Sequence, residues 1–118
     1  MGSRLPVVLL GMGEDGHTAS LFPGSAALRE PTRWVRAIRR ADVSPARVTL
    51  TPVVINAAAE VVFLVSGRAK AATLRRVREG PYQPDVLPAQ IVAPRAGRLR
   101  WLVDADAAAD LETQRKDQ

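Results

Sequence analysis

The chain has 118 residues, 47% of them hydrophobic and 25% charged, which suits one modest globular domain and excludes a disordered protein. The absence of cysteine and the presence of a single histidine exclude disulfides, thiolate catalysis and any metal site built from several histidines. The net charge of +5 comes from arginines that are scattered among acidic residues with few aromatic side chains near them, so we expect a solvated basic surface and no nucleic-acid partner.

Four apolar runs predict the strands of a parallel sheet. Short continuous runs of this kind are typical of strands that are buried on both faces. In chain order the runs are PVVLL (6–10), RWVRAI (33–38), EVVFLVSG (60–67) and RLRWLVD (98–104), of which the second and fourth are less regular.

Helical segments are predicted between these strands. Thr51 and Pro52 form a helix start, an N-cap followed by proline at the first helical position, and the helix continues to Ala59. From Arg68 to Glu79 the apolar Ala71, Leu74 and Val77 share one face, and Gly80-Pro81 ends the helix. Asp104 could cap a last helix over residues 105–112. The stretch 82–94 is rich in proline and is expected to be loop, with a possible short strand at Ile91–Val92.

Strands that alternate with helices predict the α/β class. We expect a partial Rossmann-like, mostly parallel sheet flanked by helices, forming a single partial domain over residues 1–118. The chain opens almost directly on its first strand, so we expect that an N-terminal half with further strands is missing. Ligands of such sheets bind beyond the carboxyl ends of the strands, where three loops are expected, Gly11–Gly24, Arg39–Arg47 and Ser66–Lys70.

The first of these loops, GMGEDGHTASLFPG, allows two kinds of site. Gly11, Gly13 and Gly16 have the G-x-G-x-x-G spacing of a dinucleotide-binding turn. That turn must open a long helix, however, and Phe22-Pro23-Gly24 interrupts the chain too early, so no dinucleotide cofactor is expected.

The alternative is a catalytic base in the same loop. Asp15 lies two residues before His17 and can orient its imidazole. The residues alone favour a structural role, in which His17 hydrogen-bonds the loop and Asp15 caps a short helix.

Several blocks of the sequence resemble the 6-phosphogluconolactonases, which share a superfamily with the glucosamine-6-phosphate deaminases. The blocks occur in the same order and cover nearly the whole chain, as GMGEDGHTASLFPG (11–24), RVTLTPVVINAA (47–58), VVFLVSGRAKA (61–71), LPAQIV (87–92) and GRLRWLVDADAA (97–108). The resemblance implies a hydrolase of carbohydrate metabolism that converts 6-phosphogluconolactone to 6-phosphogluconate in the pentose phosphate pathway, without a cofactor or a metal.

The resemblance also implies roles for individual residues. His17 would be the general base that activates water, Asp15 would orient it, and backbone N–H groups from Gly13 to Gly16 would be candidates for the oxyanion. Lys70 would contact the substrate phosphate, and Arg68 lies beside it in the first turn of a predicted helix, where an anion is favoured. Arg47 is a second candidate for the phosphate, and the alternative for Lys70 is a side chain that points into solvent.

Members of this family are about twice as long as this chain, which therefore resembles their C-terminal half. We expect little or no lactonase activity from the chain alone, and self-association through an exposed sheet edge. A deaminase or isomerase of the same superfamily and a non-catalytic phosphosugar-binding module remain alternatives. Because no apolar run could cross a bilayer and no signal-peptide pattern is present, we expect a cytoplasmic location and no membrane partner.

Overall fold

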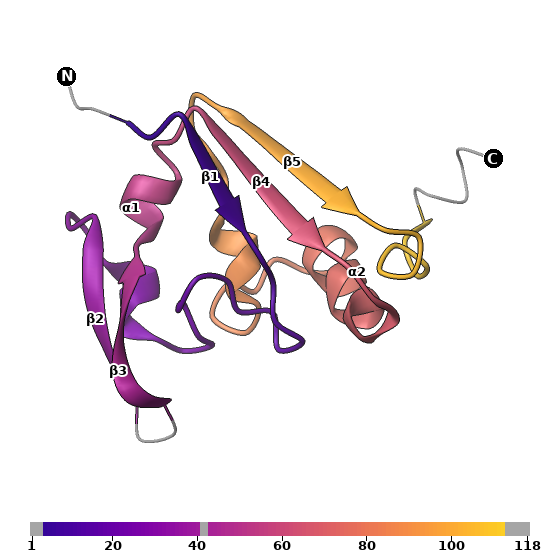
Figure 1. Cartoon of the computed structure of the whole chain (residues 1–118), viewed down its shortest axis with the longest axis horizontal. Helices are drawn as coiled ribbons and strands as arrows, with labels where there is room; N and C mark the ends of the chain where they lie inside the picture. The colour runs from indigo at the N-terminus through magenta and orange to yellow at the C-terminus, as the bar shows by residue number, and fades with distance from the viewer. Residues whose placement is uncertain (1–3, 41–42, 113–118) are drawn as a thin grey trace.

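The computed structural model describes residues 4–40 and 43–112. Its central feature is a sheet of three parallel strands, β1 (Val7–Leu10), β4 (Glu60–Val65) and β5 (Arg98–Val103), in the order β1-β4-β5. Figure 1 shows the three arrows pointing the same way. The predicted α/β class is therefore confirmed, with three of the four apolar runs in one parallel sheet.

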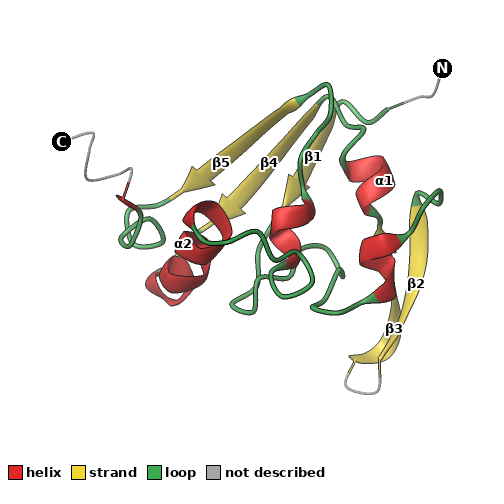
Figure 2. Cartoon of the chain, turned by 180° about the vertical axis from the view of Figure 1, so that it is seen from behind, coloured by secondary structure: helices red, strands yellow, loops and turns green. Residues whose placement is uncertain are grey.

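Helices cover one face of this sheet. Val8, Leu10 and Phe63 point into the core and are at most 7% exposed. The helix α2 (Ala71–Glu79) contributes Leu74 and Val77 to the same core, as its apolar periodicity predicted. Figure 2, in which the molecule is seen from behind, shows α2 in front of the parallel strands and α1 beside them, next to β2 and β3. An aromatic stack fixes this layer, because Phe63 and Trp101 lie 4.0 Å apart with nearly parallel rings and the Arg78 guanidinium of α2 lies over Trp101.

The opposite face of the sheet is not covered by any described segment and exposes several large apolar side chains. Val7 and Leu9 alternate with the buried residues of β1 and are 51% and 65% exposed. Leu64 of β4 and Leu102 of β5 are register partners and lie exposed on the same face. We call the surface formed by Val7, Leu9, Leu64 and Leu102 the bare face. The apolar pattern of β1 is typical of a strand buried on both faces, but in this chain one of its faces is exposed, because no described segment packs against this side of the sheet.

The run 33–38 does not join the parallel sheet. It contributes to β2 (Val35–Arg40), which pairs in antiparallel fashion with β3 (Val43–Leu50) in a separate two-stranded sheet. The prediction of a parallel strand here is wrong, and so is the prediction of a loop from Arg39 to Arg47, part of which lies outside the described residues. Pro45 and the polar residues around it made the second strand look like a loop, although an edge strand tolerates proline.

Three smaller predictions also need correction. The helix α1 begins at Pro52 as expected but ends at Ile55, and the Thr51 hydroxyl donates to the carbonyl of Arg33 instead of capping it. Residues 105–110 form turns instead of the predicted helix, because the hydrogen bonds donated by Ala109 and Leu111 span three residues and not four. Ile91 ends the short 3-10 helix η3 (Pro88–Ile91), so no strand forms at Ile91–Val92.

Candidate functional site

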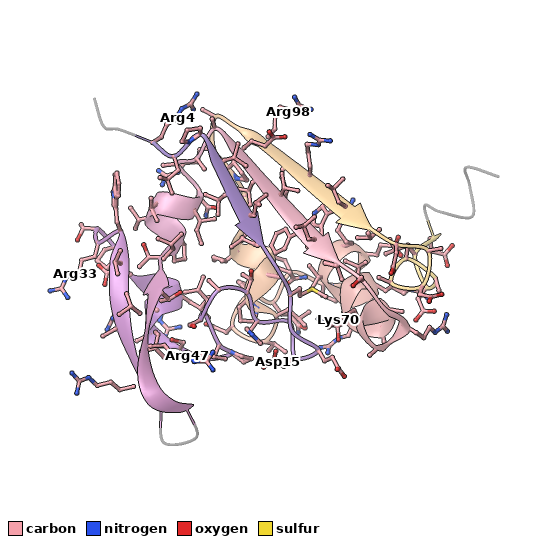
Figure 3. All side chains as sticks on the ribbon, in the orientation of Figure 1. Arg4, Asp15, Arg33, Arg47, Lys70 and Arg98 are labelled. Carbon is pink, nitrogen blue, oxygen red and sulfur yellow. The ribbon has the colours of Figure 1, made fainter. Side chains whose placement is uncertain are left out.

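The loops that follow β1 and β4 meet at the carboxyl edge of the parallel sheet. Gly11 to His17 follow β1 directly, and the 3-10 turn η2 (Arg68–Lys70) follows β4 after Gly67. Adjacent parallel strands end at the same edge, which brings these two segments together although they are distant in sequence. Figure 3 shows Asp15 and Lys70 at this end of the molecule, while Arg4 and Arg98 lie at the other end of the strands.

His17 is held by the carboxylate of Asp15. The Nδ1 atom of His17 lies 2.6 Å from Asp15 Oδ1, and the backbone N–H of His17 donates to the same oxygen at 3.1 Å. Burial raises the pKa of Asp15, but the hydrogen bonds and charge of His17 outweigh it and hold that pKa below its ordinary value. An ionised carboxylate accepts a hydrogen bond from Nδ1–H, and in the neutral imidazole with that tautomer Nε2 has the lone pair that can accept a proton.

Gly13 makes room for this pair. A Cβ atom at Gly13 would lie 2.3 Å from the Nδ1 and Cε1 atoms of His17 and 2.8 Å from Asp15 Oδ1. The N–H of Gly13 donates to the His17 carbonyl at 2.9 Å, and the N–H of Gly16 donates to the Gly13 carbonyl at 3.0 Å. These bonds fold the loop back on itself, so the two N–H groups are engaged within the loop and could serve an oxyanion only after those bonds open.

Gly16 occupies a conformation that favours glycine. Its φ is +85°, and a Cβ atom there would lie 2.8 Å from the side chain of Leu87. The carbonyl of Gly16 accepts a hydrogen bond from the N–H of Ala89, next to that leucine. Gly16 therefore anchors the loop to η3 and turns the chain so that His17 faces the sheet edge.

Lys70 and Thr73 connect the loop to the helix that follows β4. The Lys70 ammonium donates to the carbonyl of Met12, and the Thr73 hydroxyl donates to the carbonyl of Glu14 at 2.6 Å. Lys70 is half-buried and lines a cavity of about 430 Å³ together with His17, Thr18 and the backbone of Gly11 to Gly13. A cation and an imidazole with a free nitrogen lone pair therefore share one cavity.

Arg68 and Arg47 do not line this cavity. Arg68 forms an ion pair with Asp110 at 3.6 Å and its side chain is 70% exposed. Arg47 is exposed on β3, in the hairpin that touches the loop where the N–H of Ser20 donates to the Thr49 hydroxyl. In Figure 3 Arg47 lies toward the same end of the molecule as Asp15 and Lys70, on the hairpin side.

The structure adds three cavity residues that the sequence did not single out. Thr18 is buried and its hydroxyl donates to the carbonyl of Gly11 at 2.7 Å, which closes the base of the loop. Met12 supplies the carbonyl that Lys70 binds, and Ala19 lines the cavity with a φ of 51°, in a region that alanine seldom adopts. Of these three residues, the sequence could have suggested only Thr18, which follows His17 directly. Met12 and Ala19 contribute through their backbone, which their residue type does not indicate.

A second carboxylate positions the Lys70 segment from the neighbouring strand. Asp104 follows β5, and its two oxygens accept from the N–H of Gly67 at 3.1 and 3.2 Å. The same carboxylate accepts from the N–H of Ala107, and these hydrogen bonds, with that of Ala107 the stronger influence, hold the pKa of Asp104 below its ordinary value. The C-terminal ends of all three strands thus take part in building the site.

A larger cavity, of about 560 Å³, lies between residues 23–27 and β2, and Arg36 and Arg39 line it. Arg36 already pairs with Glu30 at 3.2 Å. Because neither His17 nor Lys70 lines this cavity, the smaller one is the better candidate for chemistry. Among the described residues no cluster of carboxylate and histidine side chains could hold a metal ion, and no helix there has the length and apolarity to cross a membrane.

Comparisons with known proteins identify the family to which the chain is similar. The family described as Glucosamine-6-phosphate isomerases/6-phosphogluconolactonase matches residues 2–101. A 6-phosphogluconolactonase from Rattus norvegicus is 46% identical over 111 residues, which are 91% of this chain and 42% of that protein. A 6-phosphogluconolactonase from Homo sapiens is 44% identical over 116 residues, which are 95% of this chain and 44% of that protein.

A solved structure with a similar fold supports the same family assignment. The structure of 6-phosphogluconolactonase from Trypanosoma brucei matches with a TM-score of 0.75 and 32% identity, over 90% of this chain and 42% of that one. The chain thus spans less than half the length of the relatives it matches, which fits a C-terminal half. Since the family match extends over most of the sequence and the fold agrees, the chain belongs to the glucosamine-6-phosphate isomerase/6-phosphogluconolactonase family.

Proposed function

We propose that the chain carries the acid–base part of a site that hydrolyses 6-phosphogluconolactone to 6-phosphogluconate. The observation that carries this proposal is the Asp15–His17 pair, 2.6 Å apart, at a cavity that Lys70 also lines. The names of the relatives from Rattus norvegicus and Homo sapiens supply the substrate. A cytoplasmic location remains a prediction of the sequence alone.

The reaction needs a base and then an acid at one position. Nε2 of His17 takes a proton from water while the water oxygen bonds to the lactone carbonyl carbon, which becomes a tetrahedral oxyanion. Collapse of this intermediate breaks the bond between that carbon and the ring oxygen, and the imidazolium returns the proton to the departing oxygen. The Asp15 carboxylate stabilises the imidazolium between these steps and keeps the ring in one orientation. Neither an oxidant nor a covalent nucleophile takes part.

The phosphate of the substrate would bind to Lys70. Its ammonium lies in the cavity beside His17, where it can exchange the Met12 carbonyl for a phosphate oxygen. Arg47 would reach the same anion from the hairpin, and Arg68 would do so only by giving up Asp110. Lys70 is therefore the principal phosphate contact in this proposal, and the two arginines are secondary.

The relatives are more than twice as long as the part that matches. We therefore propose that residues 1–118 form part of a larger domain and supply only part of its active site. A chimera tests the function directly, with this chain in place of the matched 116 residues of the Homo sapiens protein. We expect the chimera to hydrolyse freshly prepared lactone above the spontaneous rate, and we expect His17→Ala to abolish the activity while the protein stays folded. Wild-type turnover in the His17→Ala chimera would contradict the proposal.

Deamination of glucosamine 6-phosphate is the second candidate, because the matching family includes such isomerases. The same chimera separates the two reactions when ammonia release from glucosamine 6-phosphate is measured beside lactone hydrolysis. Ammonia release without lactone hydrolysis would favour the deaminase. Binding of 6-phosphogluconate without either reaction would favour a phosphosugar-binding module.

A further inference from the structure

The loop that carries the candidate base is held against α2 by two side chains from one face of that helix. Lys70 directly precedes α2 and Thr73 lies in its first turn, three residues further on, so both side chains project from the same face. Lys70 donates to the carbonyl of Met12, and the Thr73 hydroxyl donates to the carbonyl of Glu14 at 2.6 Å. The proposed function uses Lys70 but gives Thr73 no role.

Thr73 lies outside the cavity that His17 and Lys70 share. That cavity is lined by residues 11–13 and 17–19 and by Lys70. The Thr73 side chain is half-buried, and the next residue, Leu74, is fully buried and anchors α2 to the core. The hydroxyl is therefore presented by a firmly packed helix, and it can influence a reaction in the cavity only through the loop that it binds.

The hydrogen bond to Glu14 fixes the peptide unit that leads into Asp15. The carbonyl of Glu14 and the N–H of Asp15 belong to one planar unit, so a bond to that carbonyl restrains the point at which Asp15 begins. Asp15 Oδ1 in turn accepts from the backbone N–H of His17 and lies 2.6 Å from its Nδ1. A restraint on the Glu14 carbonyl therefore reaches the imidazole through a single side chain.

Lys70 cannot hold the loop throughout the proposed reaction. Its ammonium exchanges the Met12 carbonyl for a phosphate oxygen, which removes one of the two hydrogen bonds from this helix face to the loop. The Met12 side chain stays buried, but residues 13–15 follow it. Among the hydrogen bonds of the described residues, the one from Thr73 is then the only one that joins residues 13–15 to a segment outside the loop.

We propose that Thr73 is a positioning residue for the candidate base. Its hydroxyl keeps the carbonyl of Glu14 on α2 while the Lys70 ammonium moves from the loop to the substrate phosphate. The Asp15–His17 pair then retains its geometry when the substrate is bound. This inference rests on the proposed function, and one of its two tests needs no catalysis.

The first test compares two substrates in the chimera. Thr73→Val removes the hydroxyl and keeps the shape of the side chain, so kcat for the phosphorylated lactone is expected to fall about tenfold, the size of one lost hydrogen bond, with KM changed less than about twofold. On an unphosphorylated lactone Lys70 keeps the Met12 carbonyl, so the expected loss is below about threefold. A purely structural role of Thr73 would lower both activities alike.

Two further variants serve as controls. Thr73→Ser retains the hydroxyl and is expected to keep kcat within about twofold of the unsubstituted chimera. Thr32→Val is the matched control, because Thr32 is exposed and its hydroxyl makes no hydrogen bond within the described residues, and it is expected to change neither activity. Thr73→Ala provides a second test if Thr73→Val fails to fold.

The second test is hydrogen exchange with 6-phosphogluconate bound to the chimera. The backbone amides of residues 13–17 are expected to exchange about tenfold faster in Thr73→Val than in the unsubstituted chimera, with a smaller difference when the ligand is absent. Equal exchange with the ligand bound, or equal losses on the two lactones, would overturn the inference. Wild-type turnover in the His17→Ala chimera would instead overturn the proposed function, while the exchange measurement would still decide whether Thr73 holds the loop.

Discussion

Gly13 determines where His17 can lie, because the imidazole occupies the space that a side chain at Gly13 would need. In the chimera, Gly13→Ala is expected to lower kcat by at least ~100-fold, of the order of lost general-base assistance, since a Cβ atom 2.3 Å from Nδ1 must displace the ring. Gly11→Ala is the comparison within the same cavity, because a Cβ atom there meets nothing within 4 Å and leaves the ring of His17 in place. Steady-state hydrolysis of the lactone measures both variants. If Gly13→Ala and Gly11→Ala hydrolysed the lactone at the same rate, the His17 ring would not depend on the space beside Gly13.

Asp15 acts on the reaction through His17. Asp15→Asn leaves a side chain of the same size that can also hold the imidazole in the opposite tautomer, with Nε2 protonated, so we expect kcat to fall by ~100-fold or more with little change in KM. The lowered pKa of Asp15 means that its bond to His17 persists at pH values above its unfolded pKa of about 3.9 and is lost as the pH falls through the lower folded value. A matching loss of substrate affinity in the variant would indicate a role in loop structure instead.

Lys70 is expected to act on binding and not on the chemical step. Lys70→Ala should raise KM for the phosphorylated lactone far more than it changes hydrolysis of an unphosphorylated analogue. The comparison of both substrates in the chimera is the measurement. If the two substrates suffer alike, Lys70 supports the loop through Met12 and does not contact the phosphate.

At the scale of the elements, Asp104 connects the end of β5 to the segment that carries Lys70. Its folded pKa is lowered, so the carboxylate contributes stability that is fully present above the unfolded pKa of about 3.9 and is lost as the pH falls through the folded value. Asp104→Asn should therefore melt below the unsubstituted chain at pH 7, and the two melting temperatures should converge in acid. Thermal unfolding followed between pH 7 and pH 2 checks this. If the two melting temperatures still differed at pH 2, the loss of stability in Asp104→Asn would come from packing and not from the charge of Asp104.

The elements differ in how well their sequence predicts them. Local signals are sufficient for β1, β4 and α2, where an apolar run or a single apolar face ends at or near a glycine, and for β5, whose apolar run ends at Asp104. They are also sufficient to pair Asp15 with His17, which lie two residues apart. They fail for β3, whose proline and polar residues also suit a loop, and for residues 105–110. The Lys70–Met12 and Arg68–Asp110 contacts join distant segments, so no local pattern could predict them.

At the scale of the whole molecule, the chain alone is expected to self-associate and to show little or no lactonase activity. Its bare face exposes four large apolar side chains, and among the described strands none pairs with the outer edge of β1. This combination favours association in water. Light scattering over a range of concentrations should show growth in mass, and Leu9→Glu should suppress it. A monodisperse monomer that hydrolyses the lactone at ordinary enzymatic rates would show that residues 1–118 are sufficient.

The pairing of β1 with β4 also has a kinetic consequence. Val7 is the register partner of Glu60, so the hairpin and α1 lie between the two strands in the chain and a long loop must close before they meet. β4, α2 and β5 lie closer together in the sequence, separated only by short 3-10 turns and loops, so we expect them to assemble first and β1 to join last. The loop that carries Asp15 and His17 begins where β1 ends. The candidate base therefore reaches Lys70 only in the final stage of folding, and an opening of β1 alone would separate them while α2 stays packed.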